Sequence, residues 1–138
     1  MADLTVTAAA QSGPRAFAQA GVTPADIDVV ELYDAFTINT ILFLEDLGFC
    51  PKGEGGAFVA DGHIAPGGSL PVNTNGGLLS AGHTGVGGGT ALLVEGIRQL
   101  LGRAGPQRQI DGARRAVCAG SGGTYMDSQV LLLERVDK

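Results

Sequence analysis

The distribution of glycine is the feature that most constrains how this chain can fold. Glycine supplies 23 of the 138 residues, and most of them cluster within residues 48–89 and 112–123 without a regular period. The lack of a Gly-X-Y repeat excludes a collagen helix and favours loops that bind a ligand or pack tightly. The densest cluster, residues 73–89, places His83 in a turn where a backbone can approach a ligand closely. Bare N–H groups there lead into a helical pattern, so the segment suits an anion or a developing oxyanion.

Composition and charge narrow the class of protein. A chain of 138 residues with 44% apolar and 17% charged residues is typical of one folded domain, so we predict a single domain over residues 1–138. The formal net charge is −5 and the nine basic residues are scattered, which argues against a nucleic-acid partner. Two cysteines and no apolar run of about 18 residues predict a cytoplasmic protein without a membrane span or a disulfide framework.

Hydrophobic periodicity and turn signals predict a layered α/β domain with few strands. A sheet this small usually completes itself against another domain or subunit, so we expect a partner. The predicted elements are a helix at 7–20 interrupted near Pro14, a turn at 23–26, a strand at 27–33, a helix at 35–47, a long loop at 49–69, an extended segment at 70–72, a helix at 90–101, a strand from 116 that breaks at the glycines of 120–123, and a strand at 129–136.

Two of these helices have a recognisable apolar face. In the first, the apolar residues that repeat at helical spacing are Phe36, Phe43 and Leu47, and Ile38, Ile41 and Leu42 widen the face that is expected to be buried. In the second, Val94, Ile97 and Leu101 fall on one side of the helix.

Four positions could support chemistry. Tyr33 ends a strand, where open α/β sheets gather catalytic groups. His83 and Cys118, from separate loops, could meet as base and thiol, and the N–H of Gly120 could donate to an oxyanion. Each side chain also has a structural interpretation: a hydrogen-bonding loop histidine, a small buried cysteine and a half-buried strand aromatic.

Metal and nucleotide sites are not expected. Cys50, His63, His83 and Cys118 are too far apart in the sequence for a structural zinc site, which usually takes two ligands a few residues apart. No strand and acidic residue frame the glycines at 85–89 as a dinucleotide fingerprint requires, and the chain has no Gly-Lys-Ser/Thr for a phosphate-binding loop.

Three blocks, taken together, point to a known family. They are Tyr33-Asp34-Ala35-Phe36, then Asn75-Gly76-Gly77-Leu78-Leu79-Ser80-Ala81-Gly82-His83, then Cys118-Ala119-Gly120. In this order the blocks resemble the C-terminal half of thiolases, especially the sterol-carrier and lipid-transfer branch. Three features depart from common thiolases: Tyr33 stands where Asn or His is usual, Thr84-Gly85-Val86 replaces a proline-containing turn, and residues 124–127 are extra or altered.

The resemblance implies a fold and a set of roles. Thiolases have two similar halves, each with a five-stranded mixed sheet and helices, and form dimers or tetramers. They act on coenzyme A thioesters as substrates, with no bound cofactor. Carried onto this sequence, the roles are His83 as the base that activates a nucleophilic cysteine, Cys118 as the acid/base at the substrate α-carbon, Gly120 as an oxyanion donor, Gly82 and Asn75 as further substrate-binding residues, and Phe36 beside the pantetheine arm.

Two reactions and one non-catalytic role remain open on the sequence. The first is thiolase-type acyl transfer on 3-oxoacyl-CoA in lipid metabolism, completed by the N-terminal half that carries the nucleophile or by a homo-oligomer; the isolated chain is expected to be inactive. The second is a retro-aldol lyase of a steroid side-chain or branched hydroxyacyl-CoA, with Tyr33 as acid/base and a small acyl-CoA-binding partner subunit. The third is a truncated or interaction subunit.

Overall fold

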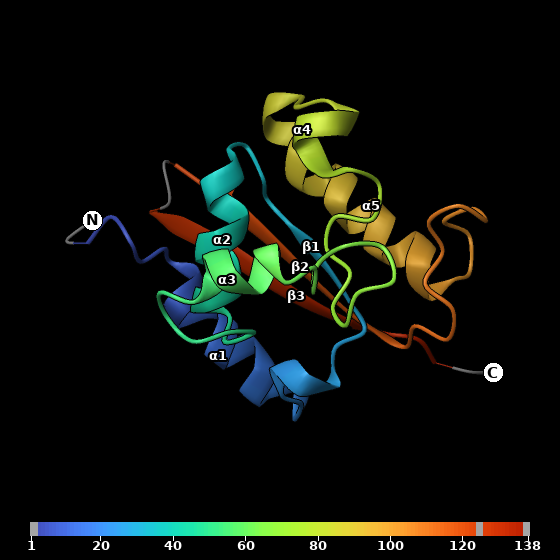
Figure 1. The fold of residues 1–138 in the computed structure, drawn as a ribbon, viewed down its shortest axis with the longest axis horizontal. Helices are drawn as coiled ribbons and strands as arrows, with labels where there is room; N and C mark the ends of the chain where they lie inside the picture. The colour runs from blue at the N-terminus through green and yellow to red at the C-terminus, as the bar shows by residue number, and fades with distance from the viewer. Residues whose placement is uncertain (1–2, 124–125, 137–138) are drawn as a thin grey trace.

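A computed structural model describes residues 3–123 and 126–136, and every structural statement below refers to that part of the chain (Figure 1). The predicted departure from thiolases at Thr124 and Tyr125 lies outside the described residues.

The sheet has three strands in the order β1-β2-β3, with β1 at Val29–Leu32, β2 at Arg115–Gly122 and β3 at Asp127–Glu134. Strand β1 runs parallel to β2, and β2 runs antiparallel to β3, so the sheet is mixed as predicted. In the parallel pair, Glu31 lies opposite Cys118 and Leu32 lies opposite Ala119.

The expectation of five strands was wrong for the described residues, which form three. A fourth segment approaches β1 but pairs through one isolated bridge, between Val72 and Val30. Pro71 has no N–H to donate to a ladder, and Asn73 takes a left-handed conformation with φ 51°, which turns the chain away. The Asn73 side chain then bonds to both the N–H (2.7 Å) and the carbonyl (3.0 Å) of Leu32.

Helices cover both faces of the sheet (Figure 1). Strand residues alternate between the faces: Val30 and Leu32 join the core under α1 and α2, whereas Val29 and Ala116 pack with Leu100 of α5 on the other face. The helices are α1 (Ala9–Ala20), α2 (Thr37–Asp46), α3 (Gly55–Ala60), α4 (Gly77–Ala81) and α5 (Gly88–Leu100), with short 3-10 turns at Pro24–Asp26 and Gly85–Gly87.

Several elements differ from the sequence-based expectation. The predicted long loop contains α3, and the glycine-rich segment contains α4. Helix α1 continues through Pro14 without a break. Strand β2 runs through Gly120 to Gly122, because those residues pair with Gln129 and Asp127 of β3 and the ladder compensates for the weak strand propensity of glycine.

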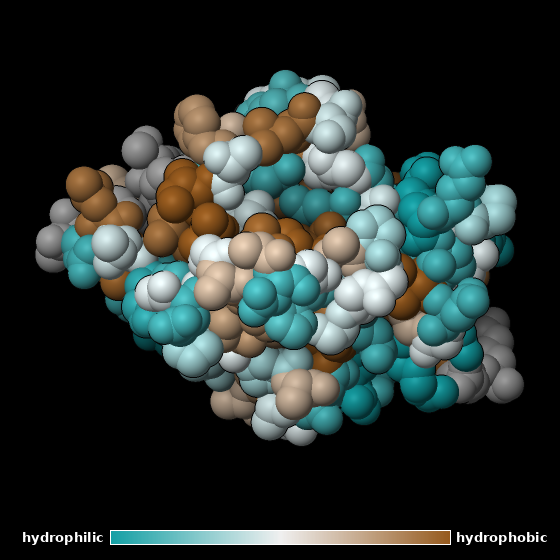
Figure 2. Space-filling model, in the orientation of Figure 1, coloured by the Kyte–Doolittle hydropathy of each residue, from teal (hydrophilic) through white to brown (hydrophobic). Residues whose placement is uncertain are grey.

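The predicted apolar faces are buried only in part. Phe43 is fully buried, but Phe36 is 65% exposed at the N-terminal cap of α2. On α5 the buried residues include Leu92 and Leu100, whereas the apolar face noted in the sequence is on the outside: Val94, Ile97 and Leu101 are 40%, 41% and 56% exposed. Figure 2 shows further hydrophobic surface over the N-terminal end of α2 and over α4.

We expect Phe43→Ala to lower the free energy of unfolding by about 3–5 kcal/mol, since it removes a fully buried ring from the core between α2 and the sheet. Ile38→Ala on the same helix removes a side chain that is 51% exposed, and should cost about 0.5 kcal/mol. Thermal or urea unfolding of the two variants beside the wild type measures the difference. Equal losses would contradict this description of the core.

Candidate active site

The candidate site lies at the carboxyl ends of the two parallel strands, where ligands gather in open α/β sheets. Tyr33 extends the pairing of β1 by one residue, because its N–H donates to the carbonyl of Ala119 at 2.9 Å. This bond places Tyr33 directly beside the segment of β2 that carries Cys118 and Gly120.

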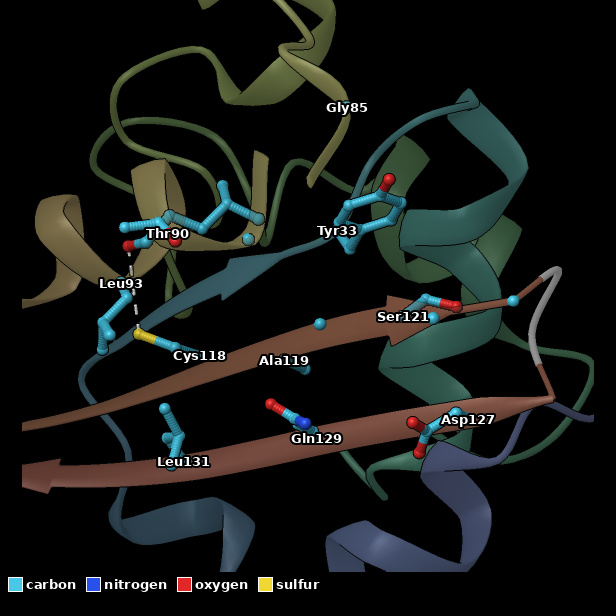
Figure 3. A pocket seen from close by; sticks show the side chains of 15 residues that line it. Tyr33, Gly85, Thr90, Leu93, Cys118, Ala119, Ser121, Asp127, Gln129 and Leu131 are labelled. Carbon is cyan, nitrogen blue, oxygen red and sulfur yellow. Dashed lines mark hydrogen bonds between the residues drawn. The ribbon is translucent and has the colours of Figure 1, made fainter. Parts of the chain in front are cut away.

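A pocket of about 490 Å³ opens between β2, β3 and the first turns of α5. In Figure 3 the side chains of Cys118, Gln129 and Leu131 project from the strands, with Tyr33 at one end. The lining residues are Tyr33, Gly85, Gly89, Thr90, Leu92, Leu93, Cys118, Ala119, Gly120, Ser121, Gly122, Gly123, Asp127, Gln129 and Leu131. The pocket thus contains three predicted site residues: Tyr33, Cys118 and Gly120.

His83 does not line the pocket itself, but it bonds to Tyr33, which does. The Tyr33 hydroxyl and His83 Nε2 are 2.7 Å apart, and the two rings meet edge-on with centroids 5.4 Å apart. The backbone N–H of Gly85 donates to His83 Nδ1 at 3.0 Å. Because Nδ1 accepts that bond, the proton of a neutral imidazole is on Nε2, which therefore donates to the Tyr33 oxygen. The tyrosine keeps its own hydroxyl proton for another acceptor.

Cys118 is buried beneath α5, with 4% of its surface exposed. Its thiol lies 3.9 Å from the carbonyl of Leu92, a weak hydrogen bond. Burial is the main reason that the pKa of Cys118 is raised to about 12, and the charge of Glu31 adds to the effect. At neutral pH the side chain is a thiol rather than a thiolate, so it is suited to giving a proton.

Gly120 lies two residues beyond Cys118 and lines the same pocket. Among the described residues, no atom comes within 4 Å of the position that a Cβ would take there, so a ligand can approach the backbone. Its carbonyl accepts a bond from the hydroxyl of Ser128 at 3.1 Å.

Three other predicted site residues do not line the pocket. Phe36 is exposed at the start of α2. Asn75 uses its side-chain oxygen to accept the N–H of Gly77 at 2.9 Å, which closes a tight turn. Gly82 ends α4 with φ 105°, and so sets the direction of the chain into His83.

Asp34 was not among the site residues predicted from the sequence. It is 4% exposed, and its carboxylate accepts the N–H groups of Leu78 (2.7 Å) and Leu79 (3.4 Å) at the start of α4. A carboxylate at free helical N–H groups is stabilising. The short helix that leads to His83 is therefore fastened to the residue next to Tyr33. The signal was present, since Asp34 is the second residue of the Tyr-Asp-Ala-Phe block.

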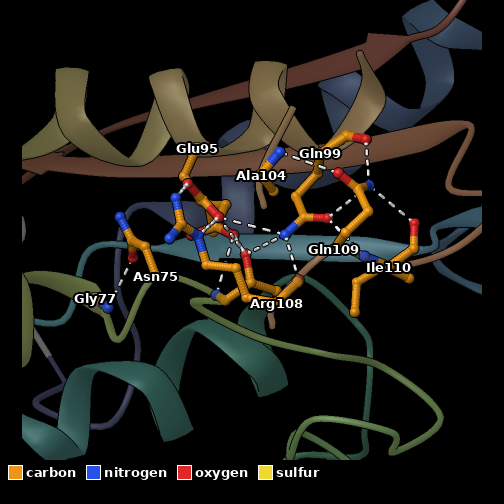
Figure 4. Close-up of polar contacts among 10 residues, drawn as sticks. Asn75, Gly77, Glu95, Gln99, Ala104, Arg108, Gln109 and Ile110 are labelled. Atoms are coloured by element: carbon orange, nitrogen blue, oxygen red, sulfur yellow. Dashed lines mark hydrogen bonds and ion pairs between the residues drawn. The ribbon is translucent and has the colours of Figure 1, made fainter. Parts of the chain in front are cut away.

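A second unassigned group is a polar cluster under α5, in which Glu95 and Gln99 reach toward Arg108 (Figure 4). Glu31 and Thr74 complete the cluster. The signal in the sequence was an acidic residue and an amide one helical turn apart in a largely apolar helix.

The remaining candidates have structural partners. His63 shares a hydrogen bond with Ser69 at 2.8 Å and stacks on Phe58 at 4.4 Å. Within residues 3–123 and 126–136 no group of three or more His, Cys, Asp or Glu side chains is arranged to hold a metal ion. No helix in the same ranges is long and apolar enough to cross a membrane.

Comparison with known proteins identifies the family. Residues 1–135 match the family model described as thiolase C-terminal domain-like. The chain belongs to this family. The resemblance noted in the sequence is thereby confirmed, and the mixed α/β architecture agrees with it.

The relatives of this chain are named for different reactions: an acetyltransferase, a lyase and an aldolase. The chain is 44% identical over 133 residues to acetyl-CoA acetyltransferase of Methanothermobacter thermautotrophicus, which covers 96% of this chain and 33% of that protein. It is 50% identical over 91 residues to 17-hydroxy-3-oxo-4-pregnene-20-carboxyl-CoA lyase of Mycobacterium tuberculosis, covering 65% of this chain and 22% of the lyase. The solved structure of the Ltp2-ChsH2(DUF35) aldolase superposes with a TM-score of 0.84 at 32% identity, over 98% of this chain and 34% of that one.

The chain therefore spans about a third or less of the thiolase-like proteins it matches.

We expect Gly77→Ala to detach α4. Gly77 has φ 66°, and a Cβ there would collide with the Asp34 carboxylate. The matched control is Gly62→Ala, at φ 82° with open space around the Cβ position, which should cost about 1–2 kcal/mol from backbone strain alone. Overpacking should add about 1–3 kcal/mol for Gly77→Ala. Thermal unfolding and hydrogen exchange of the α4 amides test this; matching behaviour of the two variants would argue against the Asp34 anchor.

Proposed function

We propose that this chain is the C-terminal half of a thiolase-type acyltransferase that cleaves or forms the carbon–carbon bond of a 3-oxoacyl-CoA thioester in lipid metabolism. The observation that carries the proposal is the convergence of Tyr33, Cys118 and Gly120 on one pocket, with His83 bonded to Tyr33 at its end. The match of residues 1–135 to the thiolase C-terminal family supports it.

Cys118 would move the proton at the substrate α-carbon. In the cleavage direction the released acyl-CoA carbanion takes the thiol proton of Cys118; in condensation the thiolate removes an α-proton. A raised pKa of about 12 keeps the resting group neutral, which suits the proton donor of cleavage. The open space beside the backbone of Gly120 would let the thioester carbonyl of the substrate approach this part of β2.

The nucleophile would come from outside this chain. The sequence contains only two cysteines, and the second, Cys50, is buried in the core beneath α1 and α2 and does not line the pocket. We propose that an N-terminal thiolase half supplies the cysteine that His83 would activate, since a second copy of this chain would bring only the same two cysteines. The outward apolar side of α5 (Val94, Ile97 and Leu101) is the surface that such a partner would cover.

A second candidate reaction is retro-aldol cleavage of a 3-hydroxyacyl-CoA, such as a steroid side-chain thioester. The Tyr33–His83 bond favours it, because His83 Nε2–H donates to Tyr33 and would stabilise its phenolate. The phenolate would take the proton of the substrate hydroxyl as the carbon–carbon bond breaks, giving a carbonyl product and an enolate that is then protonated. The relatives named as a lyase and an aldolase support this reading, with a small acyl-CoA-binding subunit as partner.

We expect Cys118→Ala and Tyr33→Phe to separate the two reactions in the protein purified with its native partners. If the thiolase proposal is right, Cys118→Ala should lower 3-oxoacyl-CoA thiolysis by about 10²–10⁴-fold, the usual contribution of a general acid/base. It should also abolish α-proton exchange of acyl-CoA. If the aldolase reading is right, Tyr33→Phe should lower 3-hydroxyacyl-CoA cleavage by a similar factor.

The control is Cys50→Ala, which removes a buried thiol outside the pocket and should leave turnover within about threefold of wild type. Full thiolysis and full α-proton exchange in Cys118→Ala would refute the thiolase assignment. Absence of both activities from the wild-type complex would leave only a binding or interaction role.

A further inference from the structure

Beneath α5, one threonine hydroxyl joins two buried acids. Thr74 Oγ1 lies 2.9 Å from Glu31 Oε1 and 3.0 Å from Glu95 Oε1. Both glutamates are buried, with 0% and 1% of their surfaces exposed. Two carboxyl oxygens this close to one hydroxyl raise the question of where the protons are.

The amide of Gln99 fixes one of the bonds. Its Oε1 accepts the backbone N–H of Ile110 at 2.9 Å, so the opposite end of the amide is the NH₂ group. That NH₂ donates to Thr74 Oγ1 at 2.8 Å and to the carbonyl of Arg108 at 2.8 Å. One lone pair of the Thr74 hydroxyl is therefore already used.

A proton count then requires one neutral carboxyl group. A hydroxyl has one proton, so Thr74 can donate to Glu31 or to Glu95 but not to both. The remaining contact, at about the same length, needs a proton on the carboxyl side, because two bare oxygens at that distance repel each other. One of the two glutamates is thus a carboxylic acid.

Arg108 decides which of the two acids carries the proton. Its guanidinium makes an ion pair with Glu95, with Nε 2.9 Å from Oε1 and Nη2 3.4 Å from Oε2, and so stabilises the ionised form of Glu95. Glu31 receives only the backbone N–H of Thr74 at 3.2 Å besides the hydroxyl contact, and its Oε2 has no partner among the described residues. Glu31 is therefore the better site for the proton.

We propose that Glu31 is a positioning residue, which in its protonated form binds Thr74 and so holds the segment 73–83 that carries His83 to Tyr33. The proton assignment depends on the contacts above alone; its effect on turnover rests on the proposed function.

Thr74 is one of several anchors between this segment and the end of β1. Asn73 bonds to the backbone of Leu32, and Asp34 holds the start of α4. In the Glu31–Thr74 contact, the donor is the carboxyl proton of Glu31, and this proton can be lost as the pH rises. Its loss would loosen the residues that precede α4.

The surroundings of Glu31 make its ionised form costly. Burial is the main reason that its pKa is raised to about 8; the bonds from Thr74 lower it, and the charges of Glu95 and then Asp34 raise it further. Cys118 faces it from β2, since the position of a Cβ on Gly96 lies close to both side chains. Ionisation of Glu31 would place a second negative charge beside Glu95 and a negative charge beside the Cys118 thiol. The guanidinium of Arg108 is already paired to Glu95.

The sign of the pH effect follows from linkage. Between about 4.5, the ordinary pKa, and about 8, the folded protein holds a proton on Glu31 that the unfolded chain has lost. Stability therefore falls as the pH rises through this window, and levels off above about 8. The Gln side chain of Glu31→Gln cannot lose a proton. The variant should therefore lack the contribution of one proton to the slope of the free energy of unfolding against pH.

Infrared spectroscopy of the protein purified with its native partners tests the proton directly. We expect a carboxylic-acid C=O band at pH 7 that titrates away near pH 8, is absent from Glu31→Gln and remains in Glu54→Gln, a control at an exposed glutamate. A band that persists unchanged in Glu31→Gln, or no acid band in the wild type at pH 7, would overturn the proposal.

Hydrogen exchange tests the link to the segment. After correction for the intrinsic pH dependence, wild-type amides at 74–79 should lose protection about tenfold or more between pH 7 and 9, whereas Glu31→Gln should show a constant level. The hydroxyl-deleting variant Thr74→Val should show low protection at both values. A wild-type protection pattern that does not change with pH would count against the positioning role.

Turnover adds a separate readout. If the proposed function is right, the alkaline limb of the wild-type activity profile should move to higher pH in Glu31→Gln. An infrared band and exchange pattern as expected, together with no thiolase or aldolase turnover, would keep the role of Glu31 and reject the proposed function.

Discussion

The parallel pairing of β1 with β2 is the constraint on which the site depends. In this register Glu31 lies opposite Cys118, and Leu32 lies opposite Ala119. The register fixes which side chains face α5 and which face α2. The pairing continues through the Tyr33 N–H, so the two chemical groups at the strand ends, Tyr33 and Cys118, meet in one pocket. A slip of β1 by one residue would turn Glu31 toward the apolar core on the other side of the sheet.

Much of this arrangement could be predicted from the sequence, because it is encoded locally. Apolar spacing located α2 and α5, and the three motif blocks indicated the family and the residues Tyr33, Cys118 and Gly120 that share a pocket. The contacts of Asp34 with α4 could not be predicted, since they join residues 44 and 45 positions apart. The same holds for the Glu31–Thr74 bond, which spans 43 positions.

Two predictions from the sequence were wrong because they depend on contacts that a single segment does not reveal. One depends on strand pairing, and the other on which surface a helix packs against. The glycines at the end of β2 signal a break when they are read alone, but the ladder with β3 keeps them extended. The apolar side of α5 that periodicity detects points outward, whereas the residues of this helix that are buried include Leu92, Gly96 and Leu100. Periodicity reveals that a helix has an apolar side, but not whether this chain or another one covers it.

Asn73 gives β1 an edge that a further strand cannot join. The outward N–H and carbonyl of Val30 bind Pro71 and Asn73, while those of Leu32 bind the amide side chain of Asn73, which stands in for a peptide group. The hydrogen-bonding capacity of that edge is saturated within the chain, which protects it against edge-to-edge aggregation. A partner that docks on this side of the molecule would therefore have to pack through side chains, because it cannot lengthen the sheet beyond β1.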